Sequence, residues 1–294
     1  MLKLRLEYHE QRAPAVPPIG APGLQVWRNR RGGVVASGFR HGGQYWMHWP
    51  YLATFGFSLD DSFITAFPEV AAPVDLIWDT YRRSVLPMAL QAMGLEALHA
   101  SAVLASSGVI AFCAASETGK STVAFGLHRR GFSQWSDDGV VFQTDRTSMT
   151  TLPLPFEVRL RSGSEEIFGN DVPLATRFRD NGPGDQMHSV PAALTAICVL
   201  TRVERTLFDG PARIERVLPA EAFRAVLAHA HTFDPFNGPR REQMLRTYLD
   251  LVARVPIFEA RFAPAREQVE ALLDTLVGGL AIQAPAAQSA VCAP

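Results

Sequence analysis

The stretch GVIAFCAASETGKSTVAFGLHRRG, residues 108–131, decides the fold. It opens with an apolar run typical of a buried strand and closes with a helical pattern that Gly131 ends. Between the two lies AASETGKS, which matches the phosphate-binding P-loop pattern G-x-x-x-x-G-K-[ST] except that Ala114 replaces the first glycine. A strand, a P-loop and a helix in this order predict an α/β fold with a nucleotide site at the start of the helix.

Residues 114–122 form the candidate nucleotide-binding loop. In such a loop the backbone N–H groups surround the phosphates, the lysine contacts the β- and γ-phosphates, and the next serine hydroxyl contacts Mg²⁺. Only Lys3 and Lys120 of the 28 basic residues are lysines, so a lysine at the loop position that requires one favours a working site over a chance match. The candidate residues are Ala114, Ala115, Ser116, Glu117, Thr118, Gly119, Lys120, Ser121 and Thr122.

Two residues depart from an ordinary P-loop. Alanine can replace the first glycine if its φ angle is negative, so Ala114 weakens the pattern without abolishing it. Glu117 is an acid within a phosphate-binding loop, which is unfavourable unless the side chain points outward. One alternative is therefore a non-enzymatic interaction protein in which both residues mark an inactive site, although Lys120 and Ser121 argue against it.

An acid pair follows the predicted helix, in WSDDGVVF at residues 135–142. Phosphoryl transfer to a hydroxyl needs a carboxylate that holds Mg²⁺ and a base that takes the hydroxyl proton. Asp137 and Asp138 can divide these two tasks. The alternative is a solvated Asp-Asp-Gly turn. The position of the pair, one helix after a P-loop, favours the catalytic reading.

The rest of the chain divides into three predicted parts. Residues 1–72 carry short strand-like runs separated by turn signals such as RRGG, which indicates a small β-rich N-terminal domain. Residues 73–280 are predicted to form the P-loop domain, opening with a helix over 73–97 that Pro87 kinks or breaks. We expect residues 281–294 to be a disordered tail.

Within the P-loop domain the periodicity predicts alternating strands and helices. A hairpin is expected over 99–105 and 108–114, with further strands on each side of the acid pair. The segment 172–190 is polar and rich in Gly and Pro, which predicts a loop. The later elements are predicted as a strand over 193–203, helices over 219–233 and 241–255, a strand over 256–263 and a helix over 265–280.

Composition excludes several functional classes. A net charge of -1 gives no electrostatic support for nucleic-acid binding. The three cysteines have unrelated spacings, so they form neither a zinc pattern nor a disulfide framework. No apolar run reaches the roughly 18 residues of a membrane helix, and the first residues lack the apolar core of a secretory signal. We therefore expect a cytoplasmic protein that contacts neither nucleic acid nor membrane.

Residues 98–142, LHASAVLASSGVIAFCAASETGKSTVAFGLHRRGFSQWSDDGVVF, resemble the catalytic core of the HPr kinase/phosphorylase family. That family carries a histidine at the start of a strand, a hairpin, a P-loop, a helix ending in Arg-Gly and an acid pair. The resemblance implies that Lys120 and the loop amides hold the phosphates of ATP, and that Ser121 and Asp138 hold Mg²⁺. It also implies that Asp137 is the base that deprotonates a serine, with His99 near the γ-phosphate.

The acceptor of the phosphate is less defined by the resemblance. The family's second signature, linked to phosphorylase activity, is missing, and residues 1–70 do not resemble the family's regulatory domain. The composition and the LHASAV strand resemble stand-alone kinases of ribosomal-peptide biosynthesis, including lasso-peptide tailoring kinases. Arg159 and Arg161 lie on one face of a predicted strand and are candidates to clamp phosphate or an acidic substrate, unless they are plain surface arginines. Arg240 and Arg241 are weaker candidates.

The sequence therefore predicts a serine kinase that depends on ATP and Mg²⁺ and acts on a small protein or a ribosomal peptide precursor. The alternative is a regulatory module that binds or hydrolyses nucleotide without modifying a protein. Homo-oligomer formation is left open by the sequence.

Overall fold

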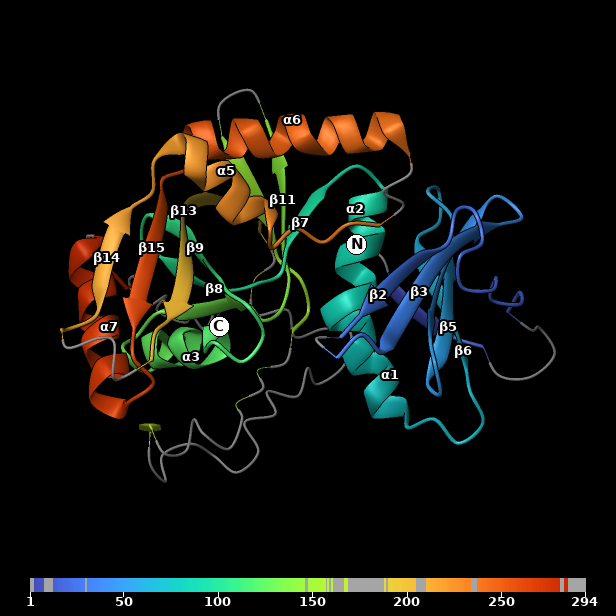
Figure 1. Cartoon of the computed structure of the whole chain (residues 1–294), viewed down its shortest axis with the longest axis horizontal. Coiled ribbons are helices and arrows are strands. Elements are labelled where there is room, and N and C mark those ends of the chain that lie inside the picture. Colours follow the sequence, from blue (N-terminus) through green and yellow to red (C-terminus); the bar gives the residue numbers. More distant parts are fainter. Residues whose placement is uncertain are drawn as a thin grey trace, which may run out of the picture. The chain divides into compact units, whose positions relative to one another are not determined.

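The computed structural model describes residues 3–7, 13–29, 31–145, 148–156, 158, 160, 167–168, 188, 190–204, 210–233, 237–280 and 283–284. The fold is mixed α/β with two sheets (Figure 1). The chain divides into two compact units, Met1–Ala97 with His231–Arg246 and Leu98–Ala230 with Thr247–Pro294. The predicted domain boundary after residue 72 stays a prediction; packing groups residues 73–97 with the N-terminal sheet.

The first unit contains a six-stranded sheet in the order β1-β6-β5-β4-β3-β2. Neighbouring strands are antiparallel, except that β1 runs parallel to β6. The predicted β-rich N-terminal region is confirmed. The strands are β1 (Lys3–Leu6), β2 (Gln25–Arg28), β3 (Val34–His41), β4 (Gln44–Trp49), β5 (Ala53–Phe57) and β6 (Phe63–Pro68).

A helical segment with a π-helical turn follows this sheet. It consists of α1 (Val74–Thr80), the π-helical turn Tyr81–Val85 and α2 (Leu86–Ala92). The sequence predicted the irregularity at Pro87, but the irregular turn precedes it. Proline lacks an N–H and cannot donate to the preceding turn, and the N–H of Leu86 instead donates to the carbonyl of Tyr81, five residues back. Pro87 itself lies in the first turn of α2, directly after the π-helical turn.

The segment His231–Arg246 is anchored in the first unit by Phe233. Its ring centroid lies 6.0 Å from Trp27, 5.5 Å from Tyr45 and 6.1 Å from Phe57. Gly38 makes room for the ring, since a Cβ there would lie 2.3 Å from it. Trp27, which is half-buried, thereby joins an aromatic cluster around Phe233.

The second unit is built on a sheet in which strands run in the order β10-β8-β9-β13-β12-β11. Strand β13 also pairs with β15, which pairs with β14. The predicted hairpin and the predicted strands around the acid pair are confirmed. The strands are β8 (Ala100–Ala105), β9 (Gly108–Cys113), β10 (Ser133–Ser136), β11 (Val140–Thr144), β12 (Met149–Leu152), β13 (Ala192–Arg202), β14 (Arg213–Arg216) and β15 (Ile257–Phe262).

The predicted helices are present, but one is shorter than expected. They are α3 (Lys120–Arg129), α5 (Pro219–Leu227), α6 (Gly238–Arg254) and α7 (Arg266–Gly279). The sequence predicted a helix up to residue 233, whereas α5 ends at Leu227. The carbonyl of His229 accepts a hydrogen bond from the N–H of His99, and Ala230 forms a β-bridge with Leu98 at the end of β7 (Glu96–Leu98), so this backbone pairs with a distant strand instead.

Helices α3 and α7 pack against each other over one face of this sheet and enclose its main apolar core (Figure 1, green and red). Gly126 of α3 permits the close approach, because a Cβ at this position would lie 2.5 Å from Cδ1 of Leu273 in α7. This packing fixes the direction of α3. The start of α3 is therefore held by a rigid core.

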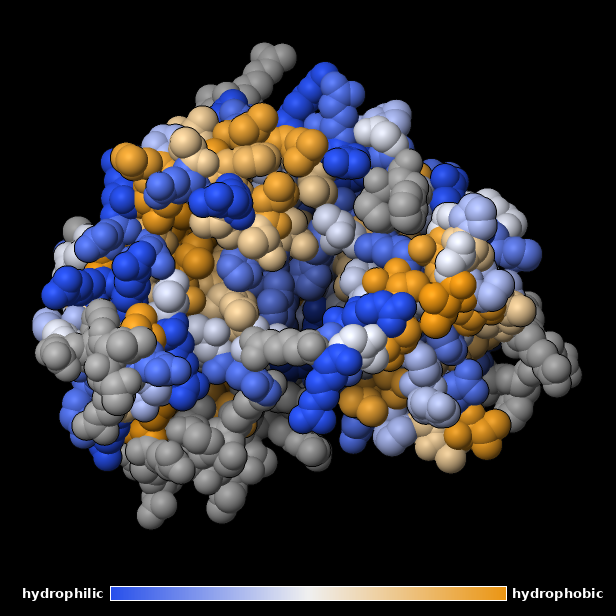
Figure 2. Space-filling model, viewed as in Figure 1, coloured by the Kyte–Doolittle hydropathy of each residue, from blue (hydrophilic) through white to orange (hydrophobic). Residues whose placement is uncertain are grey.

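None of the described helices is both long and apolar enough to cross a bilayer. Figure 2 shows apolar side chains in orange interspersed with hydrophilic ones in blue on the face in view. Of the predicted loop 172–190 only His188 and Val190 are described. The predicted tail lies outside the described residues except for positions 283 and 284.

Candidate functional site

The P-loop connects the buried end of β9 to the first turn of α3. Gly119 has φ 117°, a left-handed conformation suited to glycine, and α3 begins at Lys120. Ala114 is not among the residues with positive φ, and its side chain is buried in the core with Val123 and Phe125. Alanine is therefore compatible with the backbone at this position and adds apolar contact to the core.

Glu117 lies in the middle of the loop with its side chain exposed. Its φ of 70° is a conformation that residues other than glycine seldom adopt. Ser116 is likewise exposed, and Thr118 donates its N–H to the carbonyl of Ala115 at 3.3 Å. An exposed carboxylate is the arrangement in which an acid in this loop costs least.

Lys120 is buried, with 6% of its surface exposed. Its Nζ donates to the carbonyl of Ala114 at 3.3 Å and lies 3.0 Å from Nε2 of His99. An ammonium can only donate, so Nε2 of His99 accepts, and the ring carries its proton on Nδ1. That Nδ1 lies 3.3 Å from the carbonyl of Asp138, which accepts from it. Burial, and next the charge of Lys120, lower the pKa of His99 and keep the ring neutral.

Asp137 receives two hydroxyl groups on one carboxylate oxygen. Ser121 donates its Oγ proton to Oδ1 of Asp137 at 2.8 Å, and Ser101 of β8 donates to the same atom at 2.6 Å. Asp137 is 6% exposed and Ser101 is fully buried. The contact joins the P-loop serine to one residue of the acid pair.

Asp138 differs from its neighbour in exposure and backbone conformation. It is half-buried and has φ 64°, while its carbonyl faces His99. Asp137 lies directly after the last residue of β10, and Asp138 begins the turn toward β11. The two acids therefore occupy different environments, and the division of two catalytic tasks between them stays a prediction.

Sequence reasoning missed two residues that the fold brings to this region. Ser101 has no motif of its own; the only signal was a polar residue at an inward position of an otherwise apolar strand. His229 follows α5, and its carbonyl accepts a hydrogen bond from the N–H of His99 at 2.7 Å. Burial, and next the charge of Lys120, lower the pKa of His229. No feature of the LAHAHTF segment marks His229 in the sequence.

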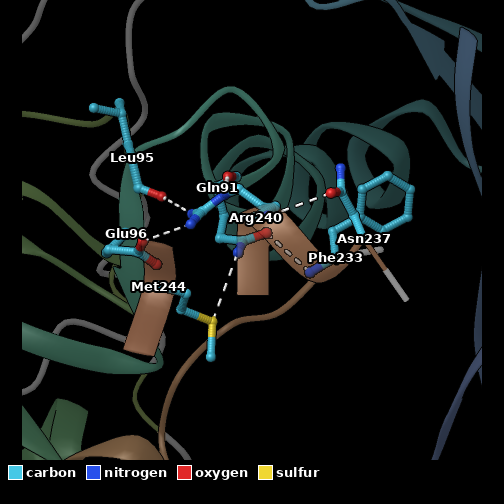
Figure 3. A network of polar contacts seen from close by, with 7 residues as sticks. All are labelled: Gln91, Leu95, Glu96, Phe233, Asn237, Arg240 and Met244. Atoms are coloured by element: carbon cyan, nitrogen blue, oxygen red, sulfur yellow. Dashed lines mark hydrogen bonds and ion pairs between the residues drawn. The ribbon is translucent and has the colours of Figure 1, made fainter. Parts of the chain in front are cut away.

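The structure describes two of the four arginine candidates, Arg240 and Arg241. Arg159 and Arg161 lie outside the described residues. Arg240 is buried in the first unit and forms an ion pair with Glu96, with Nη1 and Oε1 at 2.7 Å (Figure 3). Its guanidinium also donates to the carbonyls of Gln91 and Leu95. Arg240 is therefore a structural residue of the first unit rather than a phosphate clamp.

Comparison with known proteins gives a distant structural similarity. No protein-family model matches the chain. No curated protein matches it in sequence. Among solved structures, the HPr(Ser) kinase/phosphatase from Coxiella burnetii aligns with 63% of this chain and 95% of its own length, at 14% sequence identity and a TM-score of 0.32. A similarity of this size carries no weight for function, so the site geometry alone supports the proposal below.

Proposed function

We propose that the second unit binds ATP with Mg²⁺ and transfers the γ-phosphoryl group to a serine hydroxyl of a small protein or peptide. The observation that carries the proposal is the 2.8 Å contact between the P-loop hydroxyl of Ser121 and Oδ1 of the buried Asp137. It joins a phosphate-binding loop to a carboxylate, which are the two parts that Mg²⁺-dependent phosphoryl transfer requires.

The start of α3 and Lys120 supply the phosphate contacts. Backbone N–H groups at a helix N-terminus attract anions. The Nζ of Lys120 contacts a carbonyl and a neutral imidazole, and an anionic phosphate is a stronger partner for an ammonium than either. Lys120 can exchange these partners for phosphate oxygens while it stays in the same region. The loop geometry therefore supports nucleotide binding.

The oxygen groups at the site fit Mg²⁺. This ion is usually held by one or two carboxylates together with substrate phosphates and waters, rather than by a complete set of protein ligands. Among the described residues no group of three His, Cys, Asp or Glu forms such a set. Ser121 Oγ with one carboxylate is the donor set that fits an ion sharing its coordination with phosphates.

The roles of the two acids are assigned here by proximity. The family resemblance implied that Asp138 holds the metal and that Asp137 is the base, and that division stays a prediction. The contact with Ser121 favours the exchanged division, in which Asp137 holds Mg²⁺. Asp138 is the more exposed of the two and is better located to meet an acceptor that arrives from solvent.

The proposed step is a single displacement. ATP would supply the phosphoryl group, and Mg²⁺ would neutralise the charge that develops on it. Lys120 and the loop N–H groups bind the phosphate oxygens. Asp138 accepts the proton of the acceptor serine while the serine oxygen bonds to the γ-phosphorus. The bond from the γ-phosphorus to the bridging oxygen breaks, and ADP leaves.

The acceptor is tested by incubating the protein and MgATP with HPr or with a panel of small serine-containing peptides. A mass gain of about 80 Da on one acceptor corresponds to one phosphate and supports transfer to it. Asp138→Asn is the matched control, since it removes the proposed base and should abolish the gain. ADP release with neither acceptor modified, across a panel of peptides, favours the alternative of a nucleotide-hydrolysing regulatory module.

A further inference from the structure

Ser101 is a polar residue on an otherwise apolar face of β8. Side chains alternate along a strand, so Ser101 shares its face with Val103 and Ala105, and both of these belong to the core beneath α3. A buried hydroxyl at such a position costs free energy unless it is hydrogen-bonded. Its bond to Asp137, at 2.6 Å, is shorter than that from Ser121, at 2.8 Å.

The two serines approach Asp137 from different elements. Ser101 comes from β8, which lies between β10 and β9 in the sheet, and Ser121 comes from the first turn of α3. A carboxylate oxygen has about two acceptor positions, so two donors on Oδ1 fix both the position of that oxygen and the rotation of the group. Ser121 belongs to the loop and to the proposed metal site, whereas Ser101 belongs to the rigid sheet.

We propose that Ser101 is a positioning residue for the metal site. This inference rests on the function proposed above. Its hydroxyl holds the carboxylate of Asp137 in the orientation that Mg²⁺ binding requires. A ligand carboxylate that is already oriented pays less conformational entropy when the metal binds. Removal of a hydrogen bond behind a ligand typically lowers metal affinity by about 10- to 100-fold.

Ser136 provides a matched control in the neighbouring strand. It is a serine of β10 that is 3% exposed, directly before Asp137 in sequence. Within the described part of the chain its Oγ has no hydrogen-bond partner. Ser136→Ala therefore removes a buried hydroxyl close to the site without removing a bond to the carboxylate.

The test is calorimetric titration of ATP into the full-length protein, once in EDTA and once in excess MgCl₂. In the parent, Mg²⁺ should increase the affinity for ATP. In Ser101→Ala the ATP affinity measured in MgCl₂ should be about 10-fold lower than in the parent, and the ATP affinity measured in EDTA should be unchanged. Ser136→Ala should behave like the parent. If the alanine variant fails to fold, Ser101→Cys replaces it in the test. A cysteine is close to serine in shape but has only a weak S–H donor, so this variant should show the same loss of affinity in MgCl₂.

Three results would overturn the inference. Ser101 variants with the parent's response to Mg²⁺ would show that the hydroxyl does not serve the metal. An equal loss of ATP affinity in EDTA and in MgCl₂ would show that Ser101 only supports the fold. A parent that binds ATP under neither condition would refute the proposed function itself, and the inference with it.

Discussion

The ammonium of Lys120 lies 3.0 Å from Nε2 of a neutral His99, whose Nδ1 donates to the carbonyl of Asp138. One imidazole thereby links the P-loop lysine to the backbone of the acid pair. Proton uptake at Nε2 would remove the lone pair that accepts from Lys120, so this contact requires a neutral His99. Burial, and next the lysine charge, lower the pKa of His99.

The free energy of unfolding should decrease at acidic pH because of the His99 imidazole. The unfolded chain binds a proton at His99 near pH 6.5, whereas the folded protein does so only at lower pH. Between these two values the unfolded state holds more protons, so the free energy of unfolding decreases as the pH falls below about 7, by at most ~1.4 kcal/mol per pH unit. The thermal midpoint measured from pH 8 to 5 should fall less steeply in His99→Gln than in the parent.

His41→Gln serves as the control, since His41 is an exposed residue of β3. Its pH profile should match that of the parent. A His99→Gln profile as steep as the parent's would show that His99 does not contribute to the acid sensitivity. His229 and His48 also have a pKa lowered mainly by burial, so the variant should flatten the profile only in part.

The two acids should give different phenotypes. Asp137→Asn should weaken the Mg²⁺-dependent part of ATP binding, because the carboxylate joined to Ser121 is lost. Asp138→Asn should bind MgATP like the parent and lose phosphoryl transfer. Calorimetry and a transfer assay on both variants check this. The reverse pattern would support the division that the sequence predicted, and two variants with parental binding and turnover would show that the pair is only a turn.

The buried ion pair of the first unit should matter for stability and not for nucleotide binding. Glu96 is 1% exposed, and Arg240→Ala would leave its carboxylate without its ion-pair partner, at a cost of about 3–5 kcal/mol. Burial already raises the pKa of Glu96, against the effect of Arg240. Arg246→Ala breaks an exposed pair with Glu242 and should cost below about 0.5 kcal/mol.

Chemical denaturation of both arginine variants measures these changes. ATP affinity, determined well below the unfolding midpoint, should equal that of the parent in both. A parental free energy of unfolding for Arg240→Ala would contradict the structural role assigned to Arg240. A selective loss of ATP affinity would restore it as a phosphate-binding candidate.

The elements around the P-loop could be predicted because their signals are local. The hairpin, the loop and α3 follow from apolar periodicity and a few glycines within residues 99–131. The end of α5 could not be predicted, because the pairing of His229 with His99 competes with the helix and depends on the tertiary fold. The same holds for the site residues. Lys120, Ser121 and the acid pair could be predicted because they belong to local motifs. Ser101 could not, because its role depends on a hydrogen bond to Asp137, 36 residues away in the sequence.

Binding of MgATP at the P-loop is the central claim, and the thermal midpoint with and without millimolar MgATP tests it most directly. A ligand that binds only the folded state stabilises it, by about 2.7 kcal/mol at a hundred times its Kd. The account predicts a higher midpoint in the parent and in Lys3→Ala, which removes the other lysine of the chain, and little or no increase in Lys120→Ala. An unchanged midpoint in the parent, or an equal increase in Lys120→Ala, would contradict it.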